Sequence, residues 1–344
     1  MAVLVTGGAG YIGSHSVKAL LDAGRRVVVL DDFSAGHRGA TDALQSVARP
    51  GQLAVVEAGI ADTAIVEATC REHGVDAVMH FAAWLSVGDS VKDPAGYYRN
   101  NVAGSIGLLD GLCRAGVTRL IFSSTCATYG EPQRVPLDET HPQQPINSYG
   151  ETKLAVERAL PHFETAYGLK SVALRYFNAA GADPDGLIGE DHDPEIHIIP
   201  RAIFAARGDG ELKVFGDDYP TPDGTCLRDY IHVTDLADAH VRALESLEQG
   251  GPSARFNVGT GTPHSVKEVI DAVGRVAGRP VPYTVGPRRP GDPSSLYAAN
   301  AAIRSALGWT PRYADLEAIV GTAWRWHDAH PNGYGDRGPI TSTE

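Results

Sequence analysis

The chain has 344 residues, of which 43 % are hydrophobic, and a formal net charge of −12 at pH 7. This length suits one large domain with a smaller lobe attached, and the apolar share is enough for a full core. The acidic balance argues against a nucleic-acid partner, because a protein that binds phosphate backbones needs a basic surface to release counterions. Locally placed arginines could still hold a small anionic ligand.

The four cysteines, Cys70, Cys113, Cys126 and Cys226, lie far apart and show neither a CxxC pair nor Cys/His ligand spacing. This pattern argues against a disulfide framework and a zinc site, so we expect no bound metal and a reducing compartment. The N-terminal sequence MAVLVTGGAG lacks the basic stretch and apolar core of a signal peptide, and no uncharged run reaches membrane-spanning length. We therefore expect a cytoplasmic protein without a membrane partner.

The first half of the chain alternates short β-branched runs with helical segments. Ala2–Thr6 is an apolar run before a glycine loop, and Ser14–Ala23 has helical spacing that ends at Gly24. Alternating strands and helices predict right-handed crossovers and a doubly wound parallel sheet, as in a Rossmann fold. The further predicted strands are Arg26–Leu30, Leu53–Glu57, Ala77–Phe81, Arg119–Ser123 and Ser171–Arg175.

The character of the sequence changes after about Asn178. The stretch GADPDGLIGEDHDPEIHIIP is rich in Gly, Pro and Asp, and it cannot continue the alternation. We therefore predict a Rossmann domain over residues 1–178 that returns around residues 229–260, with a strand near Phe256–Gly259. A smaller C-terminal α/β lobe over residues 179–330 would bind the substrate. The last residues, 331–344, are expected to form a loosely held, flexible tail.

The segment VLVTGGAGYIGSH places three glycines between the first strand and the first helix. Gly7 permits a tight turn, Gly10 lets a pyrophosphate approach the backbone, and Gly13 lets the helix and the strand pack closely. The helix N-terminus then offers free N–H groups and the positive end of its dipole to the phosphates. The pattern predicts a dinucleotide site.

Two carboxylates decide between the possible dinucleotides. Asp31 ends the second strand, where a carboxylate accepts hydrogen bonds from the adenosine ribose hydroxyls. A 2′-phosphate next to Asp31 and Asp32 would meet like charges, although Arg38 could in principle reach the site. The sequence therefore predicts NAD and not NADP.

Tyr149 and Lys153 stand at i and i+4, so on a helix both side chains point to one face. A free phenol has a pKa near ~10 and is a poor base at neutral pH. A lysine ammonium beside it, with a cationic nicotinamide nearby, would lower that pKa, and Lys153 could also donate to the nicotinamide ribose. The pair follows a hydroxyl cluster at the end of a predicted strand, in which Thr125 or Ser124 could relay the proton of a substrate hydroxyl.

TGGAGYIGSH, the hydroxyl cluster with YxxxK, and RYFNAAGADPDGLIGEDHDPEIHIIP together resemble the extended short-chain dehydrogenase/reductase family. Within it the chain is similar to the UDP-glucose 4-epimerases, and FGDDYPTPDGTCLRDYIHVTDLADAH and RRPGD extend the likeness over almost the whole chain. The resemblance implies a tightly held NAD that takes a hydride from C4 of a UDP-hexose while Tyr149 removes the O4 proton. The 4-keto intermediate would turn in the pocket before the hydride returns. The same resemblance implies a homodimer.

The resemblance also assigns side chains to each ligand. Arg228 and Arg289 would hold the diphosphate with guanidinium groups suited to phosphate oxygens. The other expected contacts to the UDP-sugar are Asn178, His197, Ile198, Lys213, Phe215, Tyr230, Asp292 and Leu296. The expected contacts to NAD are Gly7, Gly10, Tyr11, Ile12, Gly13, Asp31, Asp32, Phe33, Ile60, Phe81, Ala82, Ala83, Asn100, Lys153 and Tyr176.

Several positions depart from the family pattern, among them Thr125, which replaces the serine of many relatives but keeps a hydroxyl. Gly59 stands where relatives often carry an Asp near the adenine, and Ala83-Trp84-Leu85 lacks a lysine that some relatives place beside the nicotinamide. Leu296 occupies a position where a Tyr would exclude N-acetylated sugars and a small residue would admit them. Leucine is intermediate, so UDP-GlcNAc/UDP-GalNAc and the pentose pair UDP-xylose/UDP-arabinose stay open as substrates.

Two other interpretations also stay open. A net oxidoreductase or a 4,6-dehydratase could use the same scaffold, but dehydratases need an acid pair that Thr125-Cys126-Ala127 does not supply. A net dehydrogenase would have to exchange its nicotinamide at every turnover. A non-enzymatic NAD-binding sensor or assembly protein would have no need for Tyr149, Lys153 and a hydroxyl donor together.

Overall fold

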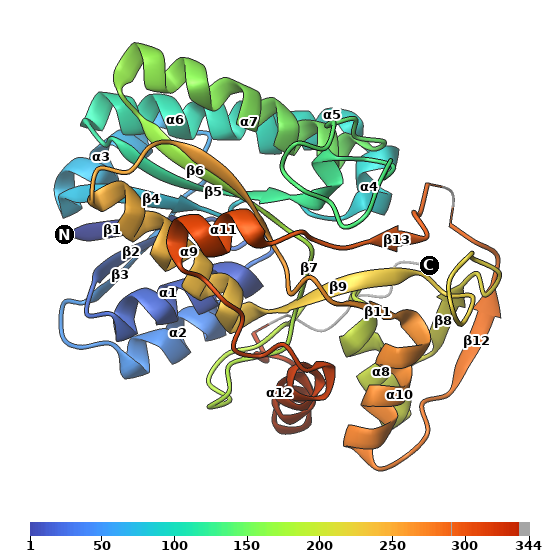
Figure 1. The fold of residues 1–344 in the computed structure, drawn as a ribbon. Coiled ribbons are helices and arrows are strands. Elements are labelled where there is room, and N and C mark those ends of the chain that lie inside the picture. The colour runs from blue at the N-terminus through green and yellow to red at the C-terminus, as the bar shows by residue number, and fades with distance from the viewer. Residues whose placement is uncertain (290, 337–344) are drawn as a thin grey trace.

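The computed structural model describes residues 1–289 and 291–336. Its centre is a seven-stranded sheet with the strand order β10-β6-β5-β4-β1-β2-β3 (Figure 1). All neighbouring pairs in this sheet are parallel, so the predicted doubly wound α/β class is confirmed. The strands are β1 (Ala2–Thr6), β2 (Arg26–Asp31), β3 (Leu53–Glu57), β4 (Val75–His80), β5 (Arg119–Thr125), β6 (Lys170–Tyr176) and β10 (Ala254–Val258).

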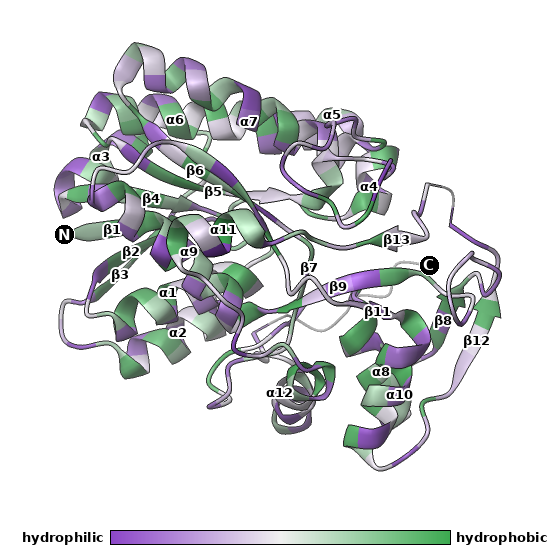
Figure 2. Ribbon diagram, viewed as in Figure 1, coloured by the Kyte–Doolittle hydropathy of each residue, from purple (hydrophilic) through white to green (hydrophobic). Residues whose placement is uncertain are grey.

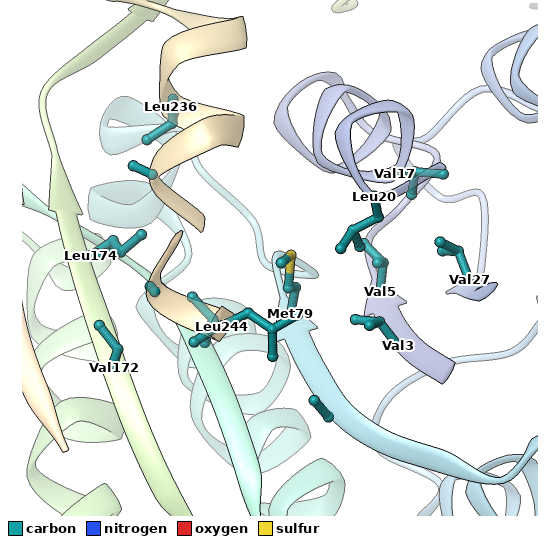
Figure 3. Packing of buried hydrophobic residues seen from close by; sticks show 14 of the residues in the cluster. Val3, Val5, Val17, Leu20, Val27, Met79, Val172, Leu174, Leu236 and Leu244 are labelled. Atoms are coloured by element: carbon teal, nitrogen blue, oxygen red, sulfur yellow. The ribbon is translucent and has the colours of Figure 1, made fainter. Parts of the chain in front are cut away.

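Helices cover both faces of the sheet because side chains alternate between the faces along each buried strand. In β1, Val3 and Val5 face the layer of α1 and α9, whereas Leu4 joins the core under the opposite helices. Figure 3 shows Val3 and Val5 with Val17 and Leu20 of α1 close by. One face carries α1 (Tyr11–Asp22), α2 (Arg38–Val47) and α9 (Val233–Glu248), and the other carries α3 (Thr63–His73), α6 (Gly104–Ala115) and α7 (Ser148–Tyr167).

The outer helices mix hydrophobic and hydrophilic residues along their length, as a helix with one face in the core and one in solvent does (Figure 2). The short helical segments of this domain are α4 (Val87–Lys92), α5 (Pro94–Tyr97), a π-helix (Tyr98–Ala103) and a 3₁₀ turn (Cys126–Thr128). Within residues 1–289 and 291–336, none of the helices combines the length and the hydrophobicity that a membrane span requires.

The smaller lobe has a sheet and a core of its own. Its central strand β9 pairs with β7, β11 and β13, while β8 pairs with β12. Helices α8 (Ile198–Arg207), α10 (Val266–Ala277) and α12 (Leu316–Ala329) share a buried cluster that includes Ile203, Val273 and Ile319. The strands are β7 (Asn178–Ala180), β8 (Leu212–Phe215), β9 (Leu227–His232), β11 (Pro263–Ser265), β12 (Tyr283–Gly286) and β13 (Ser295–Leu296).

The chain returns to the large sheet through α9, which packs against α1, and through β10, which pairs with β6. Residues 229–232 belong to β9 of the smaller sheet, so the return consists of α9 and β10. Helix α11 (Ala301–Leu307) packs on β10, and the buried Trp309 donates its indole N–H to the carbonyl of Asp235 in α9 (3.0 Å). The numerical limits of the two domains stay a prediction.

Residues 331–336 do not form the loosely held tail that the sequence predicts. The ring of Tyr334 stacks on the ring of His37, with 5.0 Å between centroids, and the carboxylate of Asp336 lies 2.7 Å from Nδ1 of the same histidine. The contacts of one aromatic ring and one carboxylate thus hold this short turn against the large domain, which its Gly- and Pro-rich composition does not indicate. The rest of the predicted tail, residues 337–344, lies outside the described residues.

A buried ion pair ties α7 to the sheet. The side chains of Glu157 in α7 and Arg175 in β6 are 1 % and 2 % exposed, and Arg175 Nη2 lies 2.6 Å from Glu157 Oε2. Arg175 also donates to the hydroxyl of Tyr129 (3.0 Å), which in turn donates to Asn257 of β10 (2.6 Å). Every charge in this network has a partner, so the loss of one member leaves a buried charge uncompensated.

We expect Arg175→Met to lower the free energy of unfolding by about 3–5 kcal/mol, because it strands the Glu157 carboxylate in the core. Urea denaturation of the purified variant measures this loss. The matched control is Arg71→Met, which removes the exposed partner of Glu67 and should cost no more than about 1 kcal/mol. Equal stabilities of the two variants would contradict the assignment of this pair as a structural tie.

Candidate functional site

A cavity of about 420 Å³ runs along the carboxyl ends of the parallel strands and continues into the smaller lobe. Gly7, Asp31 and Ile60 line its first end, and Tyr149 and Lys153 line its middle. Arg228, Asp292 and Leu296 of the smaller lobe also line it. Ligands of open α/β sheets bind at this edge, so the cavity has the position expected of a binding site.

The glycine loop is built for close approach of backbone to backbone. Gly7 adopts a left-handed φ of 70°, and a Cβ at Gly13 would lie 2.0 Å from the carbonyl oxygen of Gly7. Gly10 caps α1 without a side chain, so helix α1 begins at Tyr11 and not at Ser14 as predicted. The N-terminus of α1 therefore stands at the cavity with no side-chain cap in front of it, as a phosphate site requires.

Asp31 both lines the cavity and holds the glycine loop. One carboxylate oxygen accepts from the backbone N–H of Ala9 and the other from that of Phe33, each at 2.9 Å. Burial raises the pKa of the Asp31 carboxyl, whereas these two hydrogen bonds act in the opposite direction. Arg38, the one nearby cation considered for a 2′-phosphate, lies over the ring of Phe33 and pairs with Glu57 at 2.7 Å.

Tyr149 and Lys153 reach the same cavity because α7 begins one residue before the tyrosine. Asn147 caps the helix by accepting from the backbone N–H of Gly150 (2.9 Å). Lys153 Nζ donates to the carbonyl oxygen of Ser123 in β5 (3.0 Å), which brings the ammonium to the carboxyl end of that strand. The predicted helix face with both side chains is present, and both residues line the cavity.

Burial dominates the electrostatics of this pair. Burial raises the pKa of the Tyr149 phenol, as does the neighbouring Tyr176, and a hydrogen bond with Thr125 only partly opposes this. Burial lowers the pKa of Lys153 to about 7. In the chain by itself, desolvation therefore penalises both charged forms. The expected lowering of the phenol pKa by Lys153 together with a cationic nicotinamide stays a prediction.

The two hydroxyls proposed as alternatives for the proton relay point in different directions. Thr125 lines the cavity, whereas the Ser124 hydroxyl donates to the buried carboxylate of Glu157. Successive side chains of a strand face opposite sides of the sheet, so only one of two neighbours in β5 can face the ligand. Of the two hydroxyls, Thr125 therefore has the position that a relay would need, and its catalytic role stays a prediction.

Most of the other predicted residues line the cavity. All of the residues predicted to contact NAD do so except Phe33, whose ring lies under Arg38. The predicted UDP-sugar residues on the cavity wall are Asn178, His197, Arg228, Asp292 and Leu296. Those not on the wall are Ile198, Lys213, Phe215, Tyr230 and Arg289.

Three of the predicted residues that do not line the cavity lie together elsewhere in the smaller lobe. The Arg289 guanidinium lies 3.9 Å from the centroid of the Phe215 ring, and Lys213 Nζ lies 5.6 Å from the same centroid. Arg228, in contrast, forms an ion pair with Asp292 on the cavity wall. Of the two arginines predicted to hold a diphosphate, only Arg228 borders the cavity.

Several residues on the cavity wall were not predicted. Trp84 and Leu85 entered the prediction only as departures from the family pattern, although they belong to the wall. Cys126 directly follows Thr125, and its position after the end of a strand is the available signal. His192 lies in the acidic loop before α8, where EDHDPEIH concentrates histidines and carboxylates.

Comparisons with known proteins agree with this geometry. A family model described as the NAD dependent epimerase/dehydratase family matches residues 3–259. The UDP-glucose 4-epimerase of Lacticaseibacillus casei is 49 % identical over 338 residues, which make up 98 % of this chain and 100 % of that protein.

Two solved structures are similar over nearly their whole length. The UDP-glucose 4-epimerase from Brucella ovis in complex with NAD has a TM-score of 0.90 and 50 % identity, covering 94 % of this chain and 97 % of that one. The UDP-glucose 4-epimerase from Stenotrophomonas maltophila with bound NAD and formylated UDP-arabinopyranose has a TM-score of 0.93 and 41 % identity, covering 96 % and 99 %. With a family model matched over most of its length, the chain belongs to the NAD dependent epimerase/dehydratase family.

Proposed function

We propose that the chain is an NAD-dependent UDP-glucose 4-epimerase, which interconverts UDP-glucose and UDP-galactose through a 4-keto intermediate. One observation carries the proposal: a single cavity brings together a dinucleotide loop, the Tyr149–Lys153 pair with Thr125, and Arg228 of the smaller lobe. Relatives named UDP-glucose 4-epimerase, at 49 % and 50 % identity over nearly the whole chain, support the same reaction and sugar.

The residues at the first end of the cavity fit NAD. A Cβ at Gly7 or Gly13 would collide with neighbouring backbone, so the tight loop requires glycine at both positions. Gly10 places no side chain in front of the N-terminus of α1, whose N–H groups would face a pyrophosphate. The Asp31 carboxylate would accept from the ribose hydroxyls. Because Arg38 is already paired with Glu57, no free cation stands ready for a 2′-phosphate among these residues, which favours NAD over NADP.

The middle of the cavity supplies the proton chemistry. The Tyr149 phenolate would take the proton from O4 of the sugar, Thr125 would hydrogen-bond that oxygen, and Lys153 would hold the phenolate by its charge. When bound, NAD accepts the hydride from C4 and returns it, and its cationic ring favours the phenolate that burial alone disfavours. The same desolvation that raises the phenol pKa then strengthens every charge interaction in the site.

The far end would hold the nucleotide and leave the sugar loose. Arg228 is suited to the diphosphate, and on binding it would share its charge between Asp292 and the phosphate oxygens. Asn178 and His197 would contact the rest of the UDP group, while roles for Arg289, Lys213 and Phe215 stay predictions. The ligand bound in the Stenotrophomonas maltophila structure is a formylated UDP-arabinopyranose, and a UDP-pyranose is the substrate class proposed for this chain.

The alternatives are less well supported. Among the described residues, the carboxylates on the cavity wall are Asp31, Asp32 and Asp292, which lie at the two ends and not beside Tyr149. A 4,6-dehydratase needs an acid at that point, so this wall disfavours one. Leu296 lines the cavity, and a side chain of intermediate size leaves N-acetylhexose and pentose substrates open. A homodimer and a cytoplasmic location stay predictions.

The reaction itself gives the first test. We expect the purified chain, without added NAD, to convert UDP-galactose to UDP-glucose, because net redox is zero and the cofactor stays bound. Anion-exchange chromatography of the products measures conversion, and absorbance at 340 nm measures released NADH. Parallel incubations with UDP-GalNAc and UDP-arabinose define the sugar range. Conversion that depends on added NAD, with release of NADH, would indicate a net dehydrogenase instead.

Tyr149→Phe should lower kcat by roughly 10²-fold or more, since it removes the general base while leaving the ring in place. The NAD content of the variant, measured after denaturing the protein, should equal that of the parent chain. Normal turnover with full NAD occupancy would remove Tyr149 from the mechanism.

Thr125 and Ser124 form a matched pair for testing the relay. Thr125→Val should lower kcat about tenfold or more, because it removes a hydroxyl from the cavity wall. The thermal midpoint of unfolding should stay close to that of the parent chain. Ser124→Ala should keep kcat near the parent value but cost about 1–3 kcal/mol of stability, because a buried carboxylate loses a donor. The reverse pattern would restore Ser124 as the relay.

A further inference from the structure

A cluster of two imidazoles and two carboxylates lies in the loop that precedes α8. It consists of Glu190, His192, Glu195 and His197, called the Glu-His cluster below. One nitrogen or oxygen atom from each residue lies within 4.8 Å of all the others. The glutamate side chains are only 4 % and 7 % exposed, whereas the two histidines reach the wall of the large cavity.

The contacts inside the cluster converge on one small volume. Glu190 Oε1 lies 3.1 Å from Nδ1 of His192 and 2.5 Å from Nδ1 of His197. Glu195 closes the ring, with Oε1 3.4 Å from Nδ1 of His197 and Oε2 3.7 Å from Nδ1 of His192. A tetrahedral ion with bonds of about 2.0–2.2 Å needs ligand atoms about 3.3 Å apart. The Glu190–His192 separation is close to that value, and the two Glu195 separations, which involve different carboxylate oxygens, lie slightly above it.

A second observation points to a missing cation. Oε2 of Glu195 is buried and, within residues 1–289 and 291–336, accepts no hydrogen bond. Its 3.7 Å separation from His192 is too long for one. A buried carboxylate oxygen without a donor is costly, and native structures rarely leave one. A cation at the centre of the cluster would give this oxygen a direct bond in addition to its long ion pair with His192.

We propose that Glu190, His192, Glu195 and His197 bind a divalent transition-metal ion, with Zn²⁺ as the best fit. Imidazole nitrogens select zinc and its neighbours, whereas Mg²⁺ and Ca²⁺ prefer oxygen ligands alone. Two carboxylates balance the charge of the ion. Four protein ligands also leave no open position, as in structural zinc sites. The expectation of no zinc site rests on cysteine spacing, and this cluster contains no sulfur ligand.

The surroundings of the cluster give the ion a structural role. The indole N–H of Trp326 in α12 donates to the carbonyl of Glu190 (3.2 Å), and the His192 ring packs edge-on against the ring of Tyr11. Tyr11 lines the dinucleotide end of the cavity, and His197 lines it as well. A bound ion would therefore fix the loop before α8 between α12 and the cavity wall. The ion takes no part in the proton and hydride transfers of the proposed epimerisation, although its ligand His197 also faces the cavity.

The test uses the full chain without a purification tag, stripped of metal with a chelator and then dialysed. Titration with ZnCl₂, followed by calorimetry and by elemental analysis of the dialysed protein, should give one tightly bound Zn²⁺ per chain. His192→Ala and Glu195→Gln should each weaken Zn²⁺ binding about tenfold or more. The matched control is His162→Ala, because His162 is an exposed histidine of α7, and it should bind Zn²⁺ as the parent chain does.

Cobalt substitution gives a second measurement that needs no variant. Titration of the parent chain with CoCl₂ should produce visible absorption bands of the intensity typical of four-coordinate Co²⁺, and ZnCl₂ but not MgCl₂ should abolish them. No Zn²⁺ uptake by the parent chain would overturn the proposal and leave the cluster as ion pairs alone. Equal Zn²⁺ binding by the parent chain and a folded His192→Ala would overturn it too. Should the variants fail to fold, the cobalt spectrum still decides.

Discussion

In a parallel sheet every strand ends at the same edge, and the site of this protein follows from that constraint. The glycine loop after β1, Asp31 at the end of β2, and Thr125 at the end of β5 are distant in sequence but share one edge of the sheet. Helix α7 adds Tyr149 and Lys153, since the Lys153 ammonium donates a hydrogen bond to the carbonyl of Ser123 near the carboxyl end of β5. The smaller lobe then only has to supply the opposite wall.

The sheet itself could be predicted because its signal is local. Runs such as RVVVL are buried on both faces, so each strand is visible from its own residues. The glycine loop and the Tyr149–Lys153 spacing are local as well, and both reach the predicted cavity. The family resemblance covered the residues of the smaller lobe that local patterns do not single out, such as Arg228 and Asp292.

Long-range contacts account for what could not be predicted. Ser124 and Thr125 are neighbouring hydroxyl residues that the sequence alone does not distinguish. The hydrogen bond from Ser124 to Glu157 of α7 shows that Ser124 faces away from the cavity and that Thr125 faces it. Arg289 carries a charge suited to phosphate, yet its position over the Phe215 ring depends on a contact between separate loops. Desolvation of Tyr149 is likewise a property of the assembled cavity.

The chemistry of the pair follows from its burial. With Tyr149 and Lys153 both desolvated, the chain alone favours an uncharged phenol and weakens the ammonium. In the proposed reaction, a phenolate there would depend on the positive charge of an oxidised nicotinamide, so removal of the proton would require the bound cofactor. Such coupling would keep the Tyr149 phenol protonated until the hydride acceptor is bound.

The turn at residues 331–336 has a consequence for the newborn protein. Asp336 accepts from the backbone N–H of Gly39, and Tyr334 stacks on His37, so the loop at the Asp31 end of the cavity gains these contacts from residues far downstream in the chain. His37 and Asp336 are 299 residues apart in sequence. A ribosome-bound fragment can build the early strands, but it lacks this support for the loop until residues 334–336 have been synthesised.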